Sequence, residues 1–147
     1  DMIINQRKDI LWGDMGATYM YGTRLQFWKD GHISLSNPLL APGEVLKSWF
    51  SSSNYQGSRS QPSLPLLKGN HRYQFTMNMT CYPENSIYIK LVFLDRYEEV
   101  LEEKVEETLS FSFVYPEDAY TYKVSLVTAG FESLDFYSFS IKEYDRV

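Results

Sequence analysis

The sequence contains very little cysteine and histidine. Cys81 is the single cysteine among 147 residues, and His32 and His71 are the two histidines. One cysteine cannot form a disulfide within the chain, which fits a protein from a reducing compartment. The three residues also lack the close spacing that zinc ligands have in sequence. We therefore expect a cytoplasmic protein without an internal disulfide or a zinc site.

Basic residues and long apolar runs are also scarce. Lys and Arg number 14 against 19 Asp and Glu, so the net charge is −5 and no basic face is expected for nucleic acid. The most apolar run, residues 91–94, is far shorter than a membrane span. Residues 2–9 lack the apolar segment of a signal peptide. These patterns predict no nucleic-acid partner and no membrane span.

Motifs for catalysis are missing as well. The sequence has no Gly-x-Ser-x-Gly, and the serines at 51–53 lie in a polar run without a nearby histidine. It has no glycine-rich phosphate loop. The acidic residues of 98–107 crowd along one stretch instead of forming the separated pair that glycoside hydrolysis uses. We expect that the protein is not an enzyme and that it needs no cofactor.

Aromatic residues are abundant. They make up 16% of the chain, with 12 Tyr, 9 Phe and 3 Trp. Strands favour these residue types, so the composition favours an all-β fold. The length suits one domain with its own core, which we expect to span residues 2–147. Asp1, ahead of Met2, is expected to be an addition before the natural start.

Alternation of apolar and polar residues predicts about nine strands in a β-sandwich of jelly-roll type. The clearest signal is a hairpin, in which the turn at 29–31 joins two alternating segments and Ile33 and Leu35 point inward. Residues 2–20 are expected to be irregular, with a short strand packed on the body. The expected strands are 21–28, 32–36, 44–50, 71–81, 86–94, a segment from about 100 to 107, 109–115, 120–128 and 134–142.

The segment 98–107 allows two interpretations. Its apolar residues repeat in a way that permits a surface helix with Val100, Leu101 and Val105 inward. The other interpretation is a solvated edge strand, whose charges guard against pairing with other chains. We favour the strand, beginning near Val100, because the neighbouring segments are all strands.

A long polar loop, residues 48–65, is the main candidate for recognition, because long loops in compact domains often carry function. Sugar rings stack on aromatic side chains, while amide and guanidinium groups bind their hydroxyls. If the loop folds over the sheet, a ligand- or partner-binding set would result, comprising Trp28, Trp49, Asn54, Tyr55, Arg59 and Gln61. The competing interpretation is that the tryptophans belong to the core or anchor a protein interface.

The second half of the chain resembles jelly-roll carbohydrate-binding modules. The resemblance rests on residues 89–95, 111–116, 119, 123–126 and 134–141. In such modules an acidic residue near the last strand often helps to hold a structural calcium. Asp135 is the matching position, and it is therefore a weak candidate for a calcium ligand.

A closer resemblance covers nearly the whole chain. It rests on Trp12-Gly13, Tyr21-Gly22-Thr23, Lys29-Asp30-Gly31, residues 36–43, Trp49, Asn54-Tyr55 and residues 62–67. These residues resemble the third accessory secretory protein of the accessory Sec system in Gram-positive bacteria. The resemblance implies a carbohydrate-binding-module fold and a non-enzymatic cytoplasmic subunit. It also implies two larger partners, one glycosyltransferase-like and one acetyltransferase-like.

With the accessory SecA motor, that complex promotes export of glycosylated serine-rich-repeat adhesins. The leading hypothesis is therefore an adaptor, located at the inner face of the membrane through its complex, with contact to the adhesin or its glycans left open. A free-standing glycan-binding module and a small sugar-modifying enzyme are the rival classes. For the loop 48–65, we favour a protein partner over a sugar.

Overall fold

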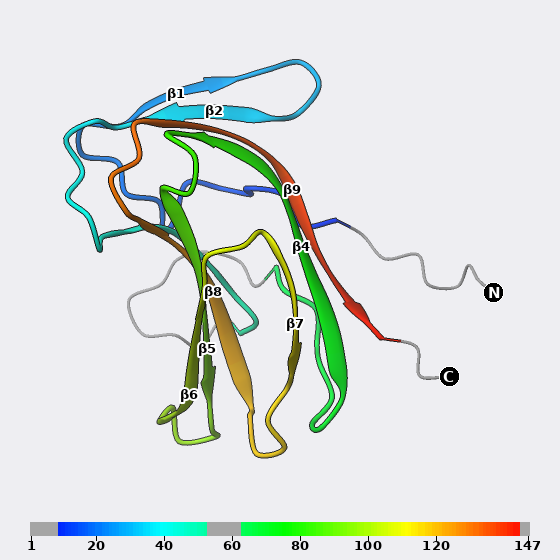
Figure 1. Cartoon of the computed structure of the whole chain (residues 1–147). Coiled ribbons are helices and arrows are strands. Elements are labelled where there is room, and N and C mark those ends of the chain that lie inside the picture. Colours follow the sequence, from blue (N-terminus) through cyan, green and yellow to red (C-terminus); the bar gives the residue numbers. More distant parts are fainter. Residues whose placement is uncertain (1–8, 53–62, 145–147) are drawn as a thin grey trace.

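Within the residues that the structure describes, nine β-strands form two antiparallel sheets that pack face to face (Figure 1). The computed structural model describes residues 9–52 and 63–144. One sheet has five strands in the order β1-β2-β9-β4-β7, and the other has four in the order β3-β8-β5-β6. The strands are β1 (Arg24–Phe27), β2 (Ile33–Ser36), β3 (Val45–Phe50), β4 (Arg72–Tyr82), β5 (Ile87–Leu94), β6 (Val100–Glu106), β7 (Ser110–Val114), β8 (Thr121–Thr128) and β9 (Ser133–Glu143).

This architecture confirms the expected all-β sandwich and its strand positions. The observed strands follow the predicted ranges closely, and the largest difference is that β1 begins at Arg24 instead of Tyr21. The described ranges contain no helix, so nothing in them could cross a membrane as a helical span.

Strict alternation along the strands builds the core between the sheets. On β4, Tyr73, Phe75, Met77 and Met79 are buried, while the residues between them are half-buried or exposed. On β8, Tyr122, Val124 and Leu126 are buried core residues, as the sequence predicts, and Ser125 is also buried, with its hydroxyl 2.8 Å from that of Ser48. Because successive side chains of a strand point to opposite faces, each of these strands gives one face to the core.

The segment 98–107 forms an edge strand. β6 pairs with β5 on one side and ends the four-stranded sheet. Val100, Leu101 and Val105 are all exposed, so the surface helix with these residues inward is the wrong interpretation. The strand interpretation is confirmed, and its exposed charges suit an edge.

The N-terminal segment crosses from one sheet to the other. Ile10 forms a bridge with Phe139 of β9, and Thr18 forms one with Lys47 of β3. Between them Trp12 is buried against Trp49 and Phe136, one from each sheet. The segment is irregular, as expected, and the short strand expected there is reduced to these two bridges.

Candidate functional site

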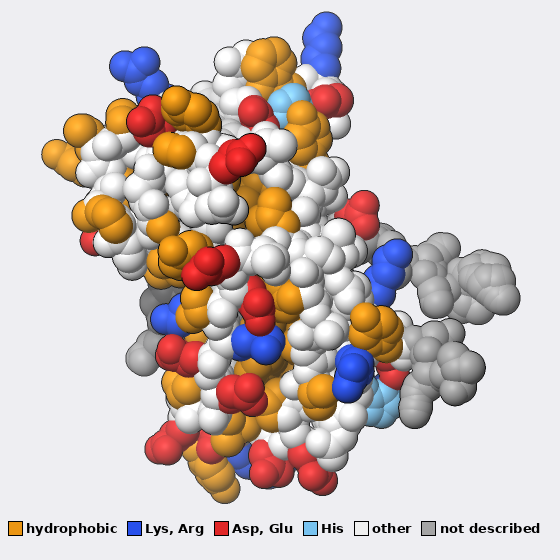
Figure 2. All heavy atoms as spheres, in the orientation of Figure 1, with side chains coloured by type: hydrophobic (Ala, Val, Ile, Leu, Met, Phe, Trp, Pro, Cys, Tyr) orange, Lys and Arg blue, Asp and Glu red, His pale blue; other side chains and the backbone are white. Residues whose placement is uncertain are grey.

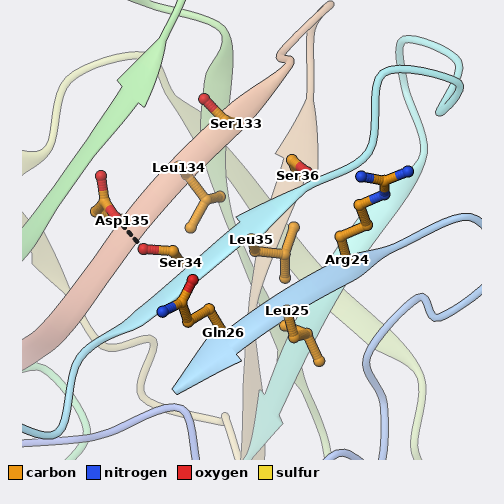
Figure 3. Close-up of a pocket in the computed structure, with 9 residues that line it drawn as sticks. All are labelled: Arg24, Leu25, Gln26, Ser34, Leu35, Ser36, Ser133, Leu134 and Asp135. Atoms are coloured by element: carbon orange, nitrogen blue, oxygen red, sulfur yellow. Dashed lines mark hydrogen bonds between the residues drawn. The ribbon is translucent and has the colours of Figure 1, made fainter. Parts of the chain in front are cut away.

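A shallow groove crosses the outward face of the five-stranded sheet where the hairpin joins β9 (Figure 3). The register places Gln26 opposite Ser34 and Ser34 opposite Asp135. Alternation turns the leucines of the three strands toward the core and leaves polar side chains on the other side of the sheet. The groove has a volume of about 490 Å³ and is lined by Arg24, Leu25, Gln26, Ser34, Leu35, Ser36, Ser133, Leu134 and Asp135.

A stack of three rings adjoins the groove at Ser34, which accepts a hydrogen bond from Trp28. The indole of Trp28 stacks on the imidazole of His32, with centroids 5.6 Å apart and planes 6° apart. His32 stacks in turn on Tyr137 of β9, with centroids 4.4 Å apart. Trp28 remains 45% exposed. The stack therefore presents a large aromatic surface beside a row of polar groups.

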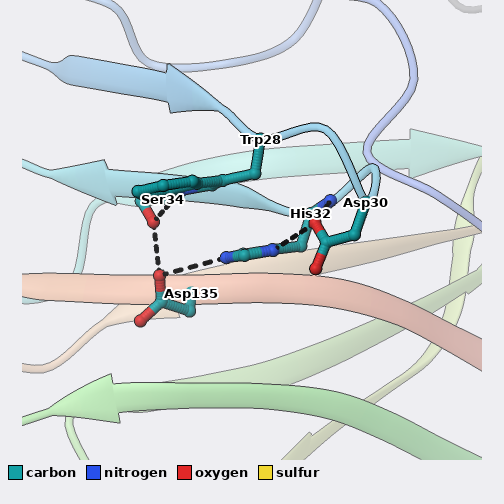
Figure 4. A network of polar contacts seen from close by, with 5 residues as sticks. All are labelled: Trp28, Asp30, His32, Ser34 and Asp135. Carbon is teal, nitrogen blue, oxygen red and sulfur yellow. Dashed lines mark hydrogen bonds and ion pairs between the residues drawn. The ribbon is translucent and has the colours of Figure 1, made fainter.

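A chain of polar contacts holds this stack in place (Figure 4). Trp28 Nε1 donates to Ser34 Oγ at 2.7 Å, and Ser34 Oγ donates to the Asp135 carboxylate. His32 Nε2 lies 3.8 Å from the same carboxylate oxygen of Asp135. Because these groups come from β2, β9 and the hairpin turn, the contacts fix the hairpin against the sheet.

Asp30 completes the chain of contacts on the turn side. Its carboxylate accepts from the backbone N–H of His32 at 3.1 Å and lies 2.6 Å from His32 Nδ1. These two contacts, first the backbone one, hold the pKa of the Asp30 carboxyl below its usual value. The carboxylate thus stays ionised and orients the imidazole.

Ser34, Asp135 and His32 do not have the arrangement of a hydrolytic triad. In a triad the imidazole lies between the serine and the carboxylate and takes the serine proton. Here the carboxylate of Asp135 lies between the hydroxyl and the imidazole. The trio therefore supports an aromatic surface and does not activate a nucleophile.

The calcium ligand at Asp135 stays a prediction. Across residues 9–52 and 63–144, no three His, Cys, Asp or Glu side chains lie close enough to hold a metal ion. The Asp135 carboxylate accepts a hydrogen bond from Ser34.

Trp49 is in the core, which corrects its place in the predicted binding set. It is 2% exposed, its Nε1 donates to Leu11 O at 2.9 Å, and its ring packs on Phe139. A β-bulge between Val45 and Lys47 is the physical reason. The extra residue turns both Leu46 and Trp49 toward the core, whereas plain alternation would have placed them on opposite faces.

The remaining members of the predicted set divide into two groups. Trp28 lies in the groove region, on the same face of the hairpin as Arg24 and Gln26. Asn54, Tyr55, Arg59 and Gln61 lie outside the described residues, and their role stays a prediction.

Several residues of this site are not predicted from the sequence. The sequence raises His32 only as a possible zinc ligand, yet its ring lies between two other rings. The alternation of Arg24, Gln26 and Trp28 on one strand could have indicated the groove. The contact of Ser34 with Asp135 joins residues 101 positions apart, and no local pattern reports it.

Comparisons with a family model and with a known protein indicate the same family. Residues 18–143 match the family model described as accessory Sec secretory system ASP3. The accessory Sec system protein ASP3 of Streptococcus gordonii is 42% identical over 152 residues, which cover 97% of this chain and 96% of that protein.

Solved structures give the same result. In the crystal structure of accessory secretory protein 1, 2 and 3 in Streptococcus pneumoniae, one chain is 57% identical with a TM-score of 0.89, covering 97% of this chain and all of that chain. A chain of the Glycosylation Associate Protein (Gap123) complex from Streptococcus agalactiae is 32% identical with a TM-score of 0.83, covering 95% of this chain and 45% of that chain.

A distant likeness concerns the fold alone. The CBM22-1-GH10 modules of Clostridium thermocellum xylanase 10B, complexed with xylohexaose, match at 12% identity and a TM-score of 0.53. The match covers 93% of this chain and 28% of that chain. It confirms the expected carbohydrate-binding-module-like sandwich.

Proposed function

The chain belongs to the family of accessory Sec secretory system ASP3 proteins, and we propose that it acts as a non-enzymatic adaptor in an accessory Sec export complex. Its partners would be two larger accessory secretory proteins, one glycosyltransferase-like and one acetyltransferase-like. Together with the accessory SecA motor, the complex would support export of glycosylated serine-rich-repeat adhesins.

One observation carries this proposal. A chain that is 57% identical and superposes over its whole length belongs to a structure of accessory secretory proteins 1, 2 and 3. The shared fold at 57% identity supports assembly of this chain with equivalent partners. The polar trio of the groove, which lacks the arrangement of a triad, agrees with a role in binding.

The location follows from the same proposal. A cytoplasmic adaptor would reach the inner face of the membrane through its complex. Its cysteine, Cys81, is a free thiol, which suits a reducing compartment.

Co-expression with the two larger accessory proteins tests the adaptor role. A stoichiometric complex of three chains that stays together through size-exclusion chromatography is the expected result. The isolated chain should show no turnover of acetyl or glycosyl donors. A chain that elutes alone in the presence of both partners would refute the adaptor role.

The groove supports a second role within the complex, namely contact with glycans of the adhesin. Trp28 offers an exposed ring for the apolar face of a sugar, while Arg24, Gln26 and Ser36 offer hydrogen-bonding groups for hydroxyls. This chemistry favours a neutral sugar over a charged ligand, because the groove carries one guanidinium and one carboxylate.

Glycan titration of wild type and Trp28→Ala tests this role. Stacking on an aromatic ring contributes about 0.5–1.5 kcal/mol, so affinity for a glycosylated repeat peptide should fall by roughly twofold to twelvefold. Tyr97→Ala, which removes another exposed ring away from the groove, should bind like wild type. Equal affinity of wild type and Trp28→Ala would exclude the groove as the glycan site.

A further inference from the structure

Two stretches without any charged side chain meet at one corner of the sandwich. Residues 15–23 precede β1, and residues 33–43 contain β2 and the turn that follows it. The whole chain is 22% charged, so a stretch of nine and one of eleven residues without charge are both unusual. Both include residues on which the family resemblance rests, and the groove with Trp28 does not account for them.

Asn37 joins the two stretches from a fully buried position. Its side-chain amide nitrogen donates to Tyr21 O and to Thr23 Oγ1, both at 2.9 Å. Its side-chain oxygen accepts from the backbone N–H of Leu39 at 3.2 Å. One buried side chain thus uses its donors and its acceptor to fix both turns, and their conformation does not depend on a ligand.

Gly22 supplies the backbone conformation of the first turn. Its φ is +76°, which side-chain-bearing residues rarely adopt, while a Cβ there would make an ordinary contact, 3.4 Å from Asn37 Oδ1. The turn at Gly22 therefore favours one arrangement of the two stretches.

The fixed turns expose large apolar side chains. Tyr21 is 82% exposed and Leu39 is 80% exposed, with Met20 half exposed beside them in the sequence. We name the surface of Met20, Tyr21 and Leu39 the apolar corner. Hydrophobic side chains gather at the upper left of Figure 2, where Figure 1 shows the turns that flank the β1–β2 hairpin.

A groove runs beside the apolar corner. It has a volume of about 630 Å³ and is lined by Gly22, Thr23, Arg24, Ser36, Pro38 and Leu39. It shares Arg24 and Ser36 with the groove at the junction of β2 and β9. A partner on the apolar corner would therefore reach the rim of that groove.

The absence of charged side chains from the two stretches indicates which kind of partner could bind there. A nucleic acid or an anionic membrane surface needs several Lys or Arg near the contact, and the two stretches supply none. Leu39 has no aromatic face for a sugar and no hydrogen-bonding group for its hydroxyls. An uncharged apolar pocket on a folded protein matches all three side chains, because interface centres are poor in charge and rich in Tyr and Met.

We propose that the apolar corner is the anchor by which this chain docks onto an uncharged pocket of one of the two larger accessory secretory proteins. The inference rests on the adaptor function proposed above and assigns a surface to it. Because Asn37 fixes the backbone of both turns, docking at this surface orders little further backbone, which favours affinity.

A matched pair of double variants tests the anchor. The corner variant carries Tyr21→Ala and Leu39→Asp. The control variant carries Tyr97→Ala and Val105→Asp, which replace residues that are 77% and 55% exposed and add the same charge. Each is co-expressed with the two partners, and the affinity of the purified chain for the partner pair is measured by surface plasmon resonance. Circular dichroism melting of each variant checks the fold.

The corner variant should melt like wild type and bind the partner pair at least about tenfold more weakly, since central anchors commonly cost this much. The control variant should bind like wild type. A corner variant that binds as wild type does would overturn the inference and leave the adaptor function intact. A control variant weakened as much as the corner variant would also overturn it, because the loss would not be specific to this surface.

Two further outcomes concern failure of the adaptor function itself and binding of the apolar corner to a membrane. If the wild-type chain does not assemble with the partners at all, the adaptor function itself fails and the anchor fails with it. Flotation with vesicles of phosphatidylglycerol and phosphatidylcholine tests a lipid surface. Flotation of wild type but not of the corner variant, with partner binding unchanged, would assign the corner to the membrane and overturn the inference.

Discussion

Lys47 lies in an environment that is unusual for a lysine, because its side chain is buried. It lies on β3 and is buried, with Nζ donating to Asp14 O at 2.8 Å and lying 5.4 Å and 5.6 Å from the ring centroids of Trp12 and Trp49. Burial lowers the pKa of its ammonium group to about 8, although the negative charge of Asp14 acts in the opposite direction. The carbonyl and the two rings compensate part of the cost of burying the charge.

The pH dependence of the unfolding free energy should reveal the lowered pKa of Lys47. The folded protein binds the proton more weakly than the unfolded chain, whose lysine titrates near 10.5. The unfolded state therefore carries more protons between about pH 8 and 10.5, and the Lys47 contribution to stability becomes less unfavourable as pH rises through that window. Between pH 7 and pH 9.5 we expect a gain of roughly 2 kcal/mol from this group.

Urea denaturation of wild type and Lys47→Met at pH 7, 8, 9 and 9.5 measures the gain. The difference in unfolding free energy between the two proteins should change with pH by this amount, because other titrating groups cancel in the difference. Lys104→Met, on the edge strand β6, controls for the loss of one positive charge. A pH-independent difference between wild type and Lys47→Met would show that the lysine is not perturbed in the folded state.

At the scale of elements, local patterns predict the strands and long-range pairing decides the site. Alternation predicts β4 and β8 because each of these strands has one face in the core. The same rule misplaces Trp49, because the bulge in β3 adds a residue that alternation cannot detect. The groove forms where β2 pairs with β9, a strand far away in the sequence, and only the tertiary fold brings Ser34 to Asp135.

The edge strand β6 gives a prediction about association. Val100, Leu101 and Val105 are exposed there among charged residues, and charge on an edge opposes pairing with another chain. Replacing Glu102 and Lys104 by Val should change the unfolding free energy by less than about 1 kcal/mol, since the first is exposed and the second only half-buried. The variant should nevertheless aggregate at concentrations where wild type stays monomeric.

Light scattering during a concentration series measures this aggregation. The same two positions changed to Thr and Arg, which keep a charge on the edge, form the matched control and should behave as wild type. Equal scattering of the valine variant and the control would mean that the charges of β6 do not protect the edge.

At the scale of the whole molecule, the N-terminal segment binds the two sheets into one unit. Besides the bridges of Ile10 and Thr18, the backbone N–H of Tyr19 donates to Leu46 O at 2.8 Å. Trp12 lies between them, and its Nε1 donates to Thr18 Oγ1 at 3.2 Å. Its ring packs edge-on against Trp49 of β3 at 5.7 Å and against Phe136 of β9 at 5.2 Å. A single side chain therefore contacts both sheets.

Trp12→Ala tests whether this segment makes the sandwich cooperative. Removing a buried tryptophan should lower the unfolding free energy by about 3–5 kcal/mol, because the cavity cannot close fully between two sheets. Tyr97→Ala, at a position that is 77% exposed, should cost less than about 1 kcal/mol and serves as the control. Unfolding in urea, followed by far-UV circular dichroism and tryptophan fluorescence, gives the free energies.

In wild type both probes should report one transition. If Trp12 holds the two sheets together, the variant should lose this coincidence, with fluorescence changing before the strands unfold. Coincident transitions with the expected loss would assign Trp12 to core packing alone.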